Sequence, residues 1–445
     1  MPVKMDFING NTRKCLFAMA LPMIAAMFLN MAYNLVDSLW IGNLLGKTAY
    51  AALTNSTPII LILNAIAMGA TNGVAILLSQ AIGAKDKTKV ESMIATSFLA
   101  AAAFALGMTV VLEVALRPLL TLLKTPEGTY QMAYEYLSIY LLGYITVYLY
   151  CYFTAVLRSF GNTVFQMAAM LVCTLLNALL DPLFIWWFGF QGTAAATLLS
   201  QFLCLFFMLL YLHKKKLFSL RISAFRKEQI LPLMKKSVPS AFQQSIPAIC
   251  TGFLTSLVSG YGITALAAYG IMGKLETILF YPAMALNMVL TSIVGQCAGG
   301  RRYDRVRDYL RSAVLYGGGL LAALSLLVIF FARPFSRMFV NSEDTAEIVS
   351  RCFQIVGLGY ILNTVTNCFL GGMNGLGKPM KSMFCMVFYY MIVRMPAAWL
   401  LSVFGAGLDG VWTAVLISHV AAAIAAAAVT IYELRTGRRP SLKPV

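Results

Sequence analysis

Two isolated carboxylates stand out in this 445-residue chain, because each lies in a long apolar segment with an asparagine one helical turn before it. They are Asp37, in the segment LNMAYNLVDSLWIG, and Asp181, in TLLNALLDPLFIWWFG. A charge near the centre of a bilayer costs about 2.5 to 3.5 kcal/mol on insertion scales, so an acid placed there indicates a function. Clustered carboxylate and amide oxygens suit a hard cation such as sodium, and a carboxylate in a low dielectric can also hold a proton.

Helical periodicity places amides beside both acids. At about 100° per residue, Asn30, Asn34 and Asp37 share one face of their helix. Asn177 and Asp181, at i and i+4, share a face of theirs. By the rise of about 1.5 Å per residue, both acids belong to the outer half of the membrane. We therefore expect one cation or proton site, although hydrogen bonding between helices is an alternative role for Asn30.

Prolines accompany both acids. Pro182 directly follows Asp181 and frees a backbone carbonyl within that helix. Pro22 precedes Asp37 by fifteen residues and is predicted to bend the first helix as a hinge. The alternative for Pro22 is an ordinary proline at the start of a helix.

The composition indicates an integral membrane protein. Hydrophobic residues make up 60% of the chain, charged residues 11%, and the mean hydropathy is +0.78. Soluble domains average about 45 to 50% apolar and about 25% charged residues. The net charge of +17 resides in short clusters between apolar runs, which argues against a nucleic-acid partner and for contact with membrane lipids. The nine cysteines are scattered singly and are interpreted as small core residues.

Apolar runs that can cross a bilayer recur along the whole chain, and twelve transmembrane helices are expected. Their predicted ranges are 15–41, 50–80, 92–115, 131–156, 164–188, 192–212, 238–260, 265–296, 311–332, 347–372, 379–404 and 408–432. If the N-terminus is cytoplasmic, 26 of the 34 lysines and arginines fall on that side and six on the other. We therefore expect a multi-pass protein of the inner (cytoplasmic) membrane with both termini in the cytoplasm.

The two halves of the chain are related by an internal repeat. At an offset of 216 residues, Gln80 pairs with Gln296 and Gly161 with Gly377, and near the end of each half the offset grows to 218. Six helices in each repeat give both halves the same orientation, which is the architecture of a transporter. Neither of the two acids has an acidic counterpart in the second half.

The fold expected from this repeat is an all-α integral membrane protein with two pseudo-symmetric six-helix lobes. The N-lobe is predicted at 1–212 and the C-lobe at 238–445. Between them, residues 213–237 form the longest polar segment, which is predicted as a basic cytoplasmic linker that touches anionic lipid headgroups.

Eight strings occur along the chain in one order: YNLVDSLWIG, LLSQAIGA, LRSFGNT, LNALLDPLFIW, GTAAATLLSQ, KLETILFYPAMALNMVLTSIVGQCAGG, GGMNGLGKP and RMPAAWLLS. Together they resemble the successive signatures of the multidrug and toxic compound extrusion (MATE) family, particularly its DNA-damage-inducible-protein-F-like branch. The resemblance covers nearly the whole chain. It implies twelve helices in two lobes around a central cavity. It also implies alternating access, in which inward movement of sodium or protons drives the export of organic, often cationic, compounds.

Carried over residue by residue, the resemblance implies a cation-coupling site in the N-lobe. Its members are Asp37, Asn177, Asp181 and Thr197, which would also be the ligands of sodium if sodium is the coupling ion. Thr193 stands where the branch usually has alanine, and its hydroxyl either strengthens cation ligation or bonds to the backbone. Asn34 completes the expected site. The sequence leaves the choice between sodium and protons open, and no cofactor is expected.

No single motif marks the substrate site. Aromatic, amide and methionine side chains are expected in the cavity, because such walls attract organic cations and adapt to many shapes. The candidates are Tyr33, Asn30, Tyr140, Tyr144, Gln201, Glu276 and Met284. Glu276 and Lys274 are two residues apart and cannot share a helix face, so the expected partner of Glu276 is Arg394. These three charged residues form either a structural network or a substrate contact.

Other functions were weighed against transport of drugs. A flippase for a lipid-linked or polysaccharide precursor, in the same superfold, is the principal alternative, but a more cationic cavity is expected of it. An intramembrane enzyme is not predicted, because the apolar helices of this chain lack clustered acid or histidine motifs. His419 is isolated on its helix. A membrane sensor is disfavoured because no soluble signalling domain is predicted. The protein is expected to work as a monomer.

Overall fold

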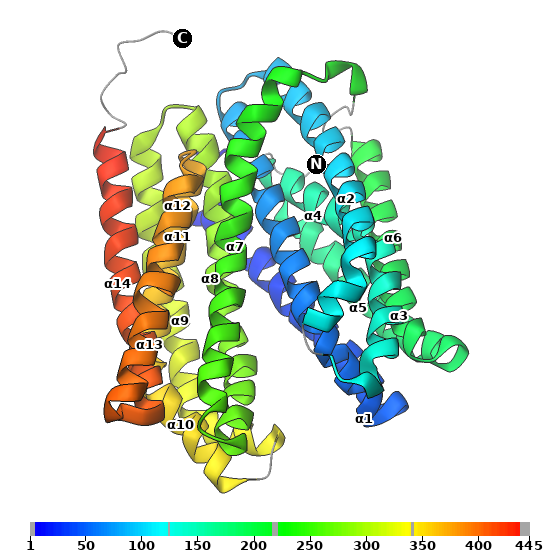
Figure 1. Cartoon of the computed structure of the whole chain (residues 1–445). Helices are drawn as coiled ribbons and strands as arrows, with labels where there is room; N and C mark the ends of the chain where they lie inside the picture. The colour runs from blue at the N-terminus through cyan, green and yellow to red at the C-terminus, as the bar shows by residue number, and fades with distance from the viewer. Residues whose placement is uncertain (1–4, 123–124, 216–220, 340–341, 437–445) are drawn as a thin grey trace. The chain divides into compact units, whose positions relative to one another are not determined.

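A computed structural model describes residues 5–122, 125–215, 221–339 and 342–436, and within these residues every regular element is a helix (Figure 1). The expected all-α class is therefore confirmed. The chain divides into two compact units, which are described separately. Unit 2 comprises Leu21–Ile82 and Asp86–Ala241, and unit 1 comprises Met1–Ala20, Gly83–Lys85 and Phe242–Val445.

The first helix, α1 (Thr12–Gly83), is two helices joined at Gly46. Gly46 has φ 79° and ψ −169°, a conformation that glycine adopts without the steric penalty of a side chain. Pro22 lies ten residues inside α1 and therefore is not a residue of the first turn. Its ring removes the hydrogen bond that the carbonyl of Ala18 would otherwise accept, which weakens the helix locally.

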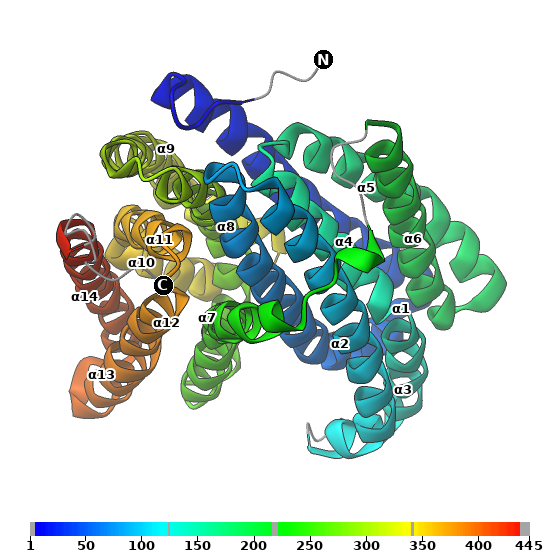
Figure 2. The same ribbon diagram turned by 90° about the horizontal axis from the view of Figure 1, so that it is seen from above.

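The remaining helices of unit 2 follow in chain order. They are α2 (Lys87–Leu122), α3 (Glu127–Leu142), α4 (Tyr144–Ser159), α5 (Thr163–Phe188), α6 (Phe190–Lys215), the short η1 (Ile222–Ala224) and η2 (Lys227–Gln229), and the start of α7 (Ile230–Ser259). The bend between α3 and α4 is 48°, so the two pass together as one apolar span. α6 packs against α3, α4 and α5 (Figure 2).

Unit 1 contains the second half of the helices. They are the rest of α7, then α8 (Ile263–Gly299), α9 (Tyr303–Phe339), α10 (Glu343–Val356), α11 (Gly359–Gly375), α12 (Pro379–Val387), the π-helix η3 (Phe388–Arg394), α13 (Met395–Leu401), η4 (Ser402–Ala406) and α14 (Gly407–Thr436). α11 packs against α8, α9 and α14. A bend of 54° separates α10 from α11, as in the matching pair of unit 2.

Twelve crossings can be traced in the described part of the chain. Eight helices are long and apolar enough to span a membrane, and the two bent pairs raise the number to ten. The segment Pro379–Thr436 counts once among the eight, yet as a single helix its 58 residues would extend roughly 87 Å, far beyond a bilayer. Gly405 and Gly407 (φ 97° and 53°) turn the chain within it, which gives two crossings. α7 is counted as the twelfth from its length of 30 residues, although it is not among the apolar spans above, and it begins at Ile230 and not at the predicted residue 238.

The internal repeat predicted from the sequence is present in the backbone. Residues with left-handed φ recur at an offset of 216, at Gly46 and Gly262, Lys85 and Arg301, and Gly161 and Gly377. A fourth pair, Gly189 and Gly407, has the offset of 218 found near the end of each half. Left-handed residues are uncommon outside glycine, so this recurrence marks equivalent turns in the two halves.

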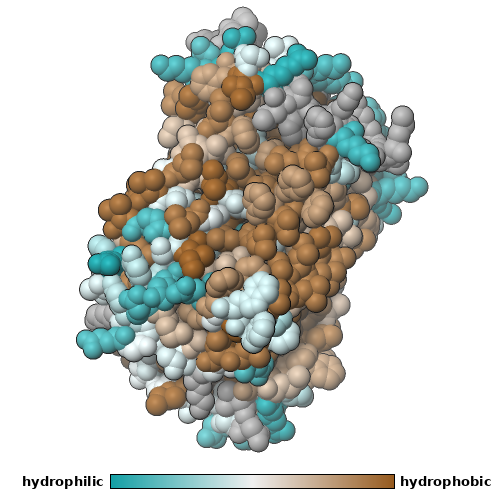
Figure 3. Space-filling view, turned by 90° about the vertical axis from the view of Figure 1, so that its right-hand side faces the viewer, coloured by the Kyte–Doolittle hydropathy of each residue, from teal (hydrophilic) through white to brown (hydrophobic). Residues whose placement is uncertain are grey.

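The surface of unit 2 is apolar over the length of its helices. Figure 3 shows apolar side chains across the centre and right of one face, with polar side chains at its two ends and along its left side. α5 and α6 contribute exposed large hydrophobic residues to the surface of the unit, namely Leu175, Leu179, Trp186, Trp187, Phe206 and Phe207. Large apolar side chains exposed on neighbouring helices are suited to contact with lipid and not with water.

Candidate functional site

Three helices of unit 2 position the acids and their neighbours. Asp37 lies on the first segment of α1, Asn177 and Asp181 lie on α5, and Thr197 lies on α6. The side chain of Asn162 accepts from the backbone N–H of Phe165 at 3.2 Å and so caps the first turn of α5. Gly189, with φ 62°, then permits the tight turn from α5 into α6.

Asp37 and Asp181 lie together, although 144 residues separate them in the chain. Asp37 is 8% exposed and Asp181 is fully buried. Their carboxyl groups interact electrostatically. Two neighbouring carboxylates repel each other when both are ionised, so a cation or a proton between them is stabilising.

Asn177 holds Asp181 in place from one turn earlier on α5. Its Nδ2 donates to Oδ1 of Asp181 at 2.9 Å, and both side chains are fully buried. Pro182 lacks an N–H, so the carbonyl of Ala178 cannot accept the usual helical hydrogen bond. The prediction of a freed carbonyl in this helix therefore agrees with the position of Pro182 inside α5.

Five buried side-chain oxygens of this region have no hydrogen-bond partner among the described residues. They are Asp37 Oδ1, Asp181 Oδ2, Asn177 Oδ1, Thr197 Oγ1 and the hydroxyl of Tyr33. Tyr33 lies beside Thr197 and Ser200, and it interacts electrostatically with Asp37. Leaving a buried acceptor unsatisfied costs about 1 to 3 kcal/mol, so such a set is unfavourable unless a positive partner satisfies it. Carboxylate, amide and hydroxyl oxygens are the donor set of a hard cation, and the same carboxyls can hold protons.

Tyr136 also belongs to this region, and the sequence analysis did not name it. Its side chain on α3 is 2% exposed, and its ring stacks on Phe190 with centroids 5.1 Å apart. Its phenol interacts electrostatically with both Asp37 and Asp181. A signal was present in the sequence, because tyrosines recur every four residues from 136 to 152 and so occupy one helical face.

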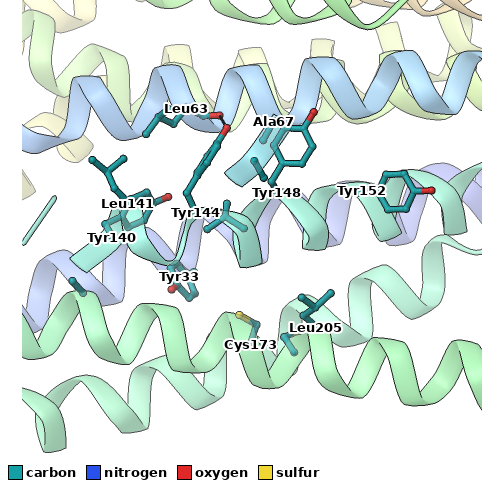
Figure 4. Packing of buried hydrophobic residues seen from close by; sticks show 14 of the residues in the cluster. Tyr33, Leu63, Ala67, Tyr140, Leu141, Tyr144, Tyr148, Tyr152, Cys173 and Leu205 are labelled. Carbon is teal, nitrogen blue, oxygen red and sulfur yellow. Dashed lines mark hydrogen bonds between the residues drawn. The ribbon is translucent and has the colours of Figure 1, made fainter. Parts of the chain in front are cut away.

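Tyr140 and Tyr144, predicted as walls of the substrate cavity, lie in the packed core of unit 2. The Tyr144 hydroxyl donates to the carbonyl of Leu63 at 3.0 Å, and the Tyr140 hydroxyl donates to Oδ1 of Asn64 at 3.4 Å. Figure 4 shows the ring of Tyr144 reaching the helix segment that carries Leu63. Both tyrosines thus connect the α3–α4 pair to the second segment of α1.

The other polar residues predicted in unit 2 are placed differently from the cluster. Asn30 and Asn34 are exposed, and Nδ2 of Asn34 donates to the backbone carbonyl of Asn30 at 2.7 Å. Thr193 is fully buried and its hydroxyl donates to the carbonyl of Phe190 at 2.8 Å, which is the backbone bond considered for it. Gln201 is half-buried, and its Oε1 has no hydrogen-bond donor among the described residues.

Glu276 and Met284, the remaining cavity candidates, lie on α8 of unit 1 and are half-buried. Oε1 of Glu276 accepts from the hydroxyl of Tyr360 at 2.7 Å. The expected direct pairing of Glu276 with Arg394 is wrong, because no ion pair joins these two described residues and they interact only at longer range. Lys274 lies over the ring of Phe339, with its Nζ 4.9 Å from the centroid.

Arg394 forms a buried polar network at the end of the π-helix η3. Its Nε donates to Oγ of Ser418 at 2.9 Å and its Nη2 to the hydroxyl of Tyr389 at 2.8 Å. The guanidinium also lies 4.6 Å from the ring centroid of Tyr390. His419, which the sequence analysis regarded as isolated, has its Nδ1 2.6 Å from the Tyr389 hydroxyl. Within the described ranges, these neutral partners bind the guanidinium and no ion pair involves Arg394.

Known proteins match both halves of this chain in sequence and share its fold. The profile of the family described as MatE matches this chain twice, over residues 22–183 and 239–400. The chain is similar to the probable multidrug resistance protein YpnP of Bacillus subtilis, with 27% identity over 81% of this chain and 83% of the relative. It is also similar to the probable multidrug resistance protein NorM of Thermotoga maritima, with 24% identity over 90% of this chain and 88% of the relative.

Among solved structures, a mutant of the MATE transporter VcmN from Vibrio cholerae superposes with a TM-score of 0.91. The sequence identity is 24%, and the match covers 96% of this chain and 97% of that one. The likeness shows the shared fold, which has twelve helices in two lobes.

Proposed function

This chain belongs to the MatE family of multidrug efflux transporters, and we propose that it is a secondary active antiporter that exports small organic compounds in exchange for sodium ions or protons. Members of this family are ion-coupled antiporters in the inner membrane and use no enzymatic cofactor. The chain is a multi-pass membrane transporter and not an enzyme. Its assignment to the DNA-damage-inducible-protein-F-like branch stays a prediction.

The cluster around Asp37 and Asp181 carries the proposal. Two interacting carboxyls lie among buried oxygens that have no hydrogen-bond partner in the described part of the chain. A sodium ion or protons would neutralise the charge that these carboxyls carry when ionised. We assign ion ligation to Asp37, Asn177, Asp181 and Thr197, because these residues supply four of the unpartnered oxygens. Tyr33 supplies the fifth and is assigned to the edge of the same site.

Ion binding is proposed to move helix α1 relative to α5 and α6. Asp37 is on α1, whereas Asn177, Asp181 and Thr197 are on α5 and α6, so an ion that draws the oxygens together acts across a helix boundary. Pro22 weakens α1 fifteen residues before Asp37 and is the proposed hinge. The membrane potential contributes about 2.3 kcal/mol per charge for each 100 mV, which is sufficient to shift such a two-state equilibrium.

Further assignments belong to this proposal. Organic cations are the proposed substrates, with Asn30, Gln201, Glu276 and Met284 as candidate contacts. The transporter is proposed to work as a monomer of two six-helix lobes; the linker predicted at 213–237 is shorter in the structure, because α6 extends to Lys215 and α7 begins at Ile230. Both termini are proposed to lie in the cytoplasm; residues 1–4 and 437–445 lie outside the described part of the chain, as do residues 216–220 of the linker.

The coupling role is tested by efflux of a fluorescent organic cation from cells that express the wild-type chain, Asp37→Asn or Asp181→Asn. Both variants keep the size of the side chain and remove its charge, so efflux is expected to fall at least tenfold in each. Glu113→Gln is the matched control, because Glu113 is another acid of unit 2 and accepts its hydrogen bond from Ser138 outside the cluster. It should retain efflux within about twofold.

Expression and thermal unfolding of each variant are measured in parallel, so that a loss of efflux is attributed to function only in folded protein. Undiminished efflux in both acid variants would contradict the coupling role. It would leave the flipping of a lipid-linked precursor as the function to examine.

A further inference from the structure

A groove opens on the surface of unit 1 between α12 with the start of η3 and α14. Its volume is about 540 Å³. Four residues on each side line it, namely Lys381, Phe384, Cys385 and Phe388 on one side and Ala425, Ala428, Val429 and Tyr432 on the other. Both sets have the spacing i, i+3, i+4, i+7, so each is one face of one helix. The small side chains Ala425 and Ala428 leave the space that the opposite aromatic rings border.

The groove is apolar along most of its length. From Phe388 to Lys381, and from Ala425 to Tyr432, each wall rises about 10 Å, roughly a third of the hydrocarbon thickness of a bilayer. Phe384 is 60% exposed, so the groove is open at the surface of a unit that lies in lipid. An apolar groove of this length can hold part of an extended acyl chain.

One end of the groove is basic. Lys381 and Tyr432 meet there, with the ammonium of Lys381 5.8 Å from the centroid of the Tyr432 ring. Lys381 forms an ion pair with Glu433, and Nζ of Lys378 lies 4.0 Å from the same carboxylate. The side chain of Glu433 is 10% exposed, whereas both lysine side chains are about half exposed. Two positive charges therefore surround one buried negative charge, and the excess positive charge faces outward.

We propose that this groove is a binding site for an anionic phospholipid, with an acyl chain along α12 and α14 and the phosphate at Lys378 and Lys381. Each ammonium has three donors, so a lysine that bonds Glu433 retains donors for a phosphate. Glu433 holds the two lysines at the mouth of the groove, which reduces the ordering that the headgroup must impose. A basic cluster at the end of an apolar groove between helices is the arrangement that selects anionic lipids over zwitterionic ones.

The proposal does not depend on the ion cluster, because every residue in it belongs to unit 1. Efflux and lipid binding can therefore fail separately. If the termini lie in the cytoplasm, this end of the groove faces the cytoplasmic leaflet, where the sequence also places most of the basic residues.

Native mass spectrometry of the full chain in detergent tests the site with phosphatidylglycerol and phosphatidylcholine of the same acyl chains. The wild-type protein is expected to bind phosphatidylglycerol about tenfold more tightly. The double variant Lys378→Gln with Lys381→Gln should bring the two affinities within about twofold of each other. Lys14→Gln, which removes a basic residue outside the groove, should keep the tenfold preference.

Two further arms identify what is recognised. Ala428→Trp fills the groove and should weaken binding of both lipids, and thermal unfolding of each variant confirms that it is folded. Inorganic phosphate at the concentration of the lipid should not displace phosphatidylglycerol. Equal binding of both lipids by the wild-type protein, a preference retained in the double lysine variant, or displacement by inorganic phosphate would each overturn the proposal.

Discussion

The side-chain amide of Asn177 donates a 2.9 Å hydrogen bond to Oδ1 of Asp181 one turn further along α5. The remaining oxygens of the pair, Asn177 Oδ1 and Asp181 Oδ2, are buried and accept no hydrogen bond from any described residue. The amide thus orients the carboxylate while both side chains keep an acceptor free. This is the relationship expected of two ligands of one cation.

Replacing Asn177 is expected to weaken ion binding. Asn177→Ala removes a hydrogen bond to a charged group, worth about 1.5 to 3 kcal/mol, together with one oxygen ligand. The ion concentration for half-maximal efflux in proteoliposomes should rise about 10- to 100-fold. Asn34→Ala is the control, because Asn34 is exposed and donates to the backbone carbonyl of Asn30. It should shift this concentration less than threefold. Equal shifts in both variants would argue against ligation by Asn177.

Two threonines on α6 should differ in their effect on coupling. The buried hydroxyl of Thr197 has no hydrogen-bond partner in the part of the chain that the structure describes, whereas that of Thr193 donates to the carbonyl of Phe190. Thr197→Val keeps the shape and removes the ligand, so the half-maximal ion concentration should rise about tenfold. Thr193→Val should leave it within about twofold. The reverse order would assign ligation to Thr193, the residue with the unusual hydroxyl.

The hydroxyl of Tyr136 is expected to affect the ionisation of Asp37 and Asp181 but not the stability of the protein. Tyr136→Phe keeps the stacking on Phe190 but removes a hydroxyl that interacts electrostatically with both acids. If protons are the coupling ion, the pH of half-maximal efflux should differ from that of the wild-type chain. Tyr144→Phe loses the bond to the Leu63 carbonyl and should cost about 1 kcal/mol of stability without moving this pH. A shift with Tyr144→Phe and none with Tyr136→Phe would contradict these roles.

Arg394 is expected to stabilise unit 1 and not to contact substrate. Arg394→Lys keeps the charge but loses the fork that reaches Ser418 and Tyr389, so unfolding should become easier by about 1 to 3 kcal/mol. Thermal unfolding in detergent measures this change. Efflux normalised to the amount of folded protein should stay within about twofold. Lost efflux at unchanged stability would instead assign Arg394 to the substrate site.

Much of the fold follows from local sequence. Long apolar runs indicated the crossings, and the glycines of the repeat proved to be the left-handed turns that recur at offsets of 216 and 218. The start of α7 was misplaced because Lys235 and Lys236 resemble a linker, whereas long basic side chains can extend from the end of a membrane helix toward water. The bent spans were also missed, since a break at a single glycine such as Gly143 leaves the apolar pattern intact.

Each member of the ion cluster could be predicted from the sequence, but the residues of other helices that surround the cluster could not. A buried acid in an apolar helix can be recognised in the sequence. The i, i+4 spacing of Asn177 and Asp181 places them on one helix face, where the structure shows their hydrogen bond. Which residues of other helices approach them depends on packing between segments far apart in the chain. That packing places Tyr136 near the ion cluster and Tyr140 and Tyr144 in the core, although the three tyrosines follow one another at intervals of four residues.

The most direct test of ion coupling at Asp37 and Asp181 is transport by the purified chain in proteoliposomes with sodium and pH gradients imposed separately. An outward gradient of the coupling ion, with the higher concentration inside the vesicles, should drive uptake of an organic cation in exchange for that ion, and the other gradient should not. Asp37→Asn and Asp181→Asn should abolish the driven component, whereas Glu113→Gln should retain it. Driven transport that survives both acid variants would contradict the account.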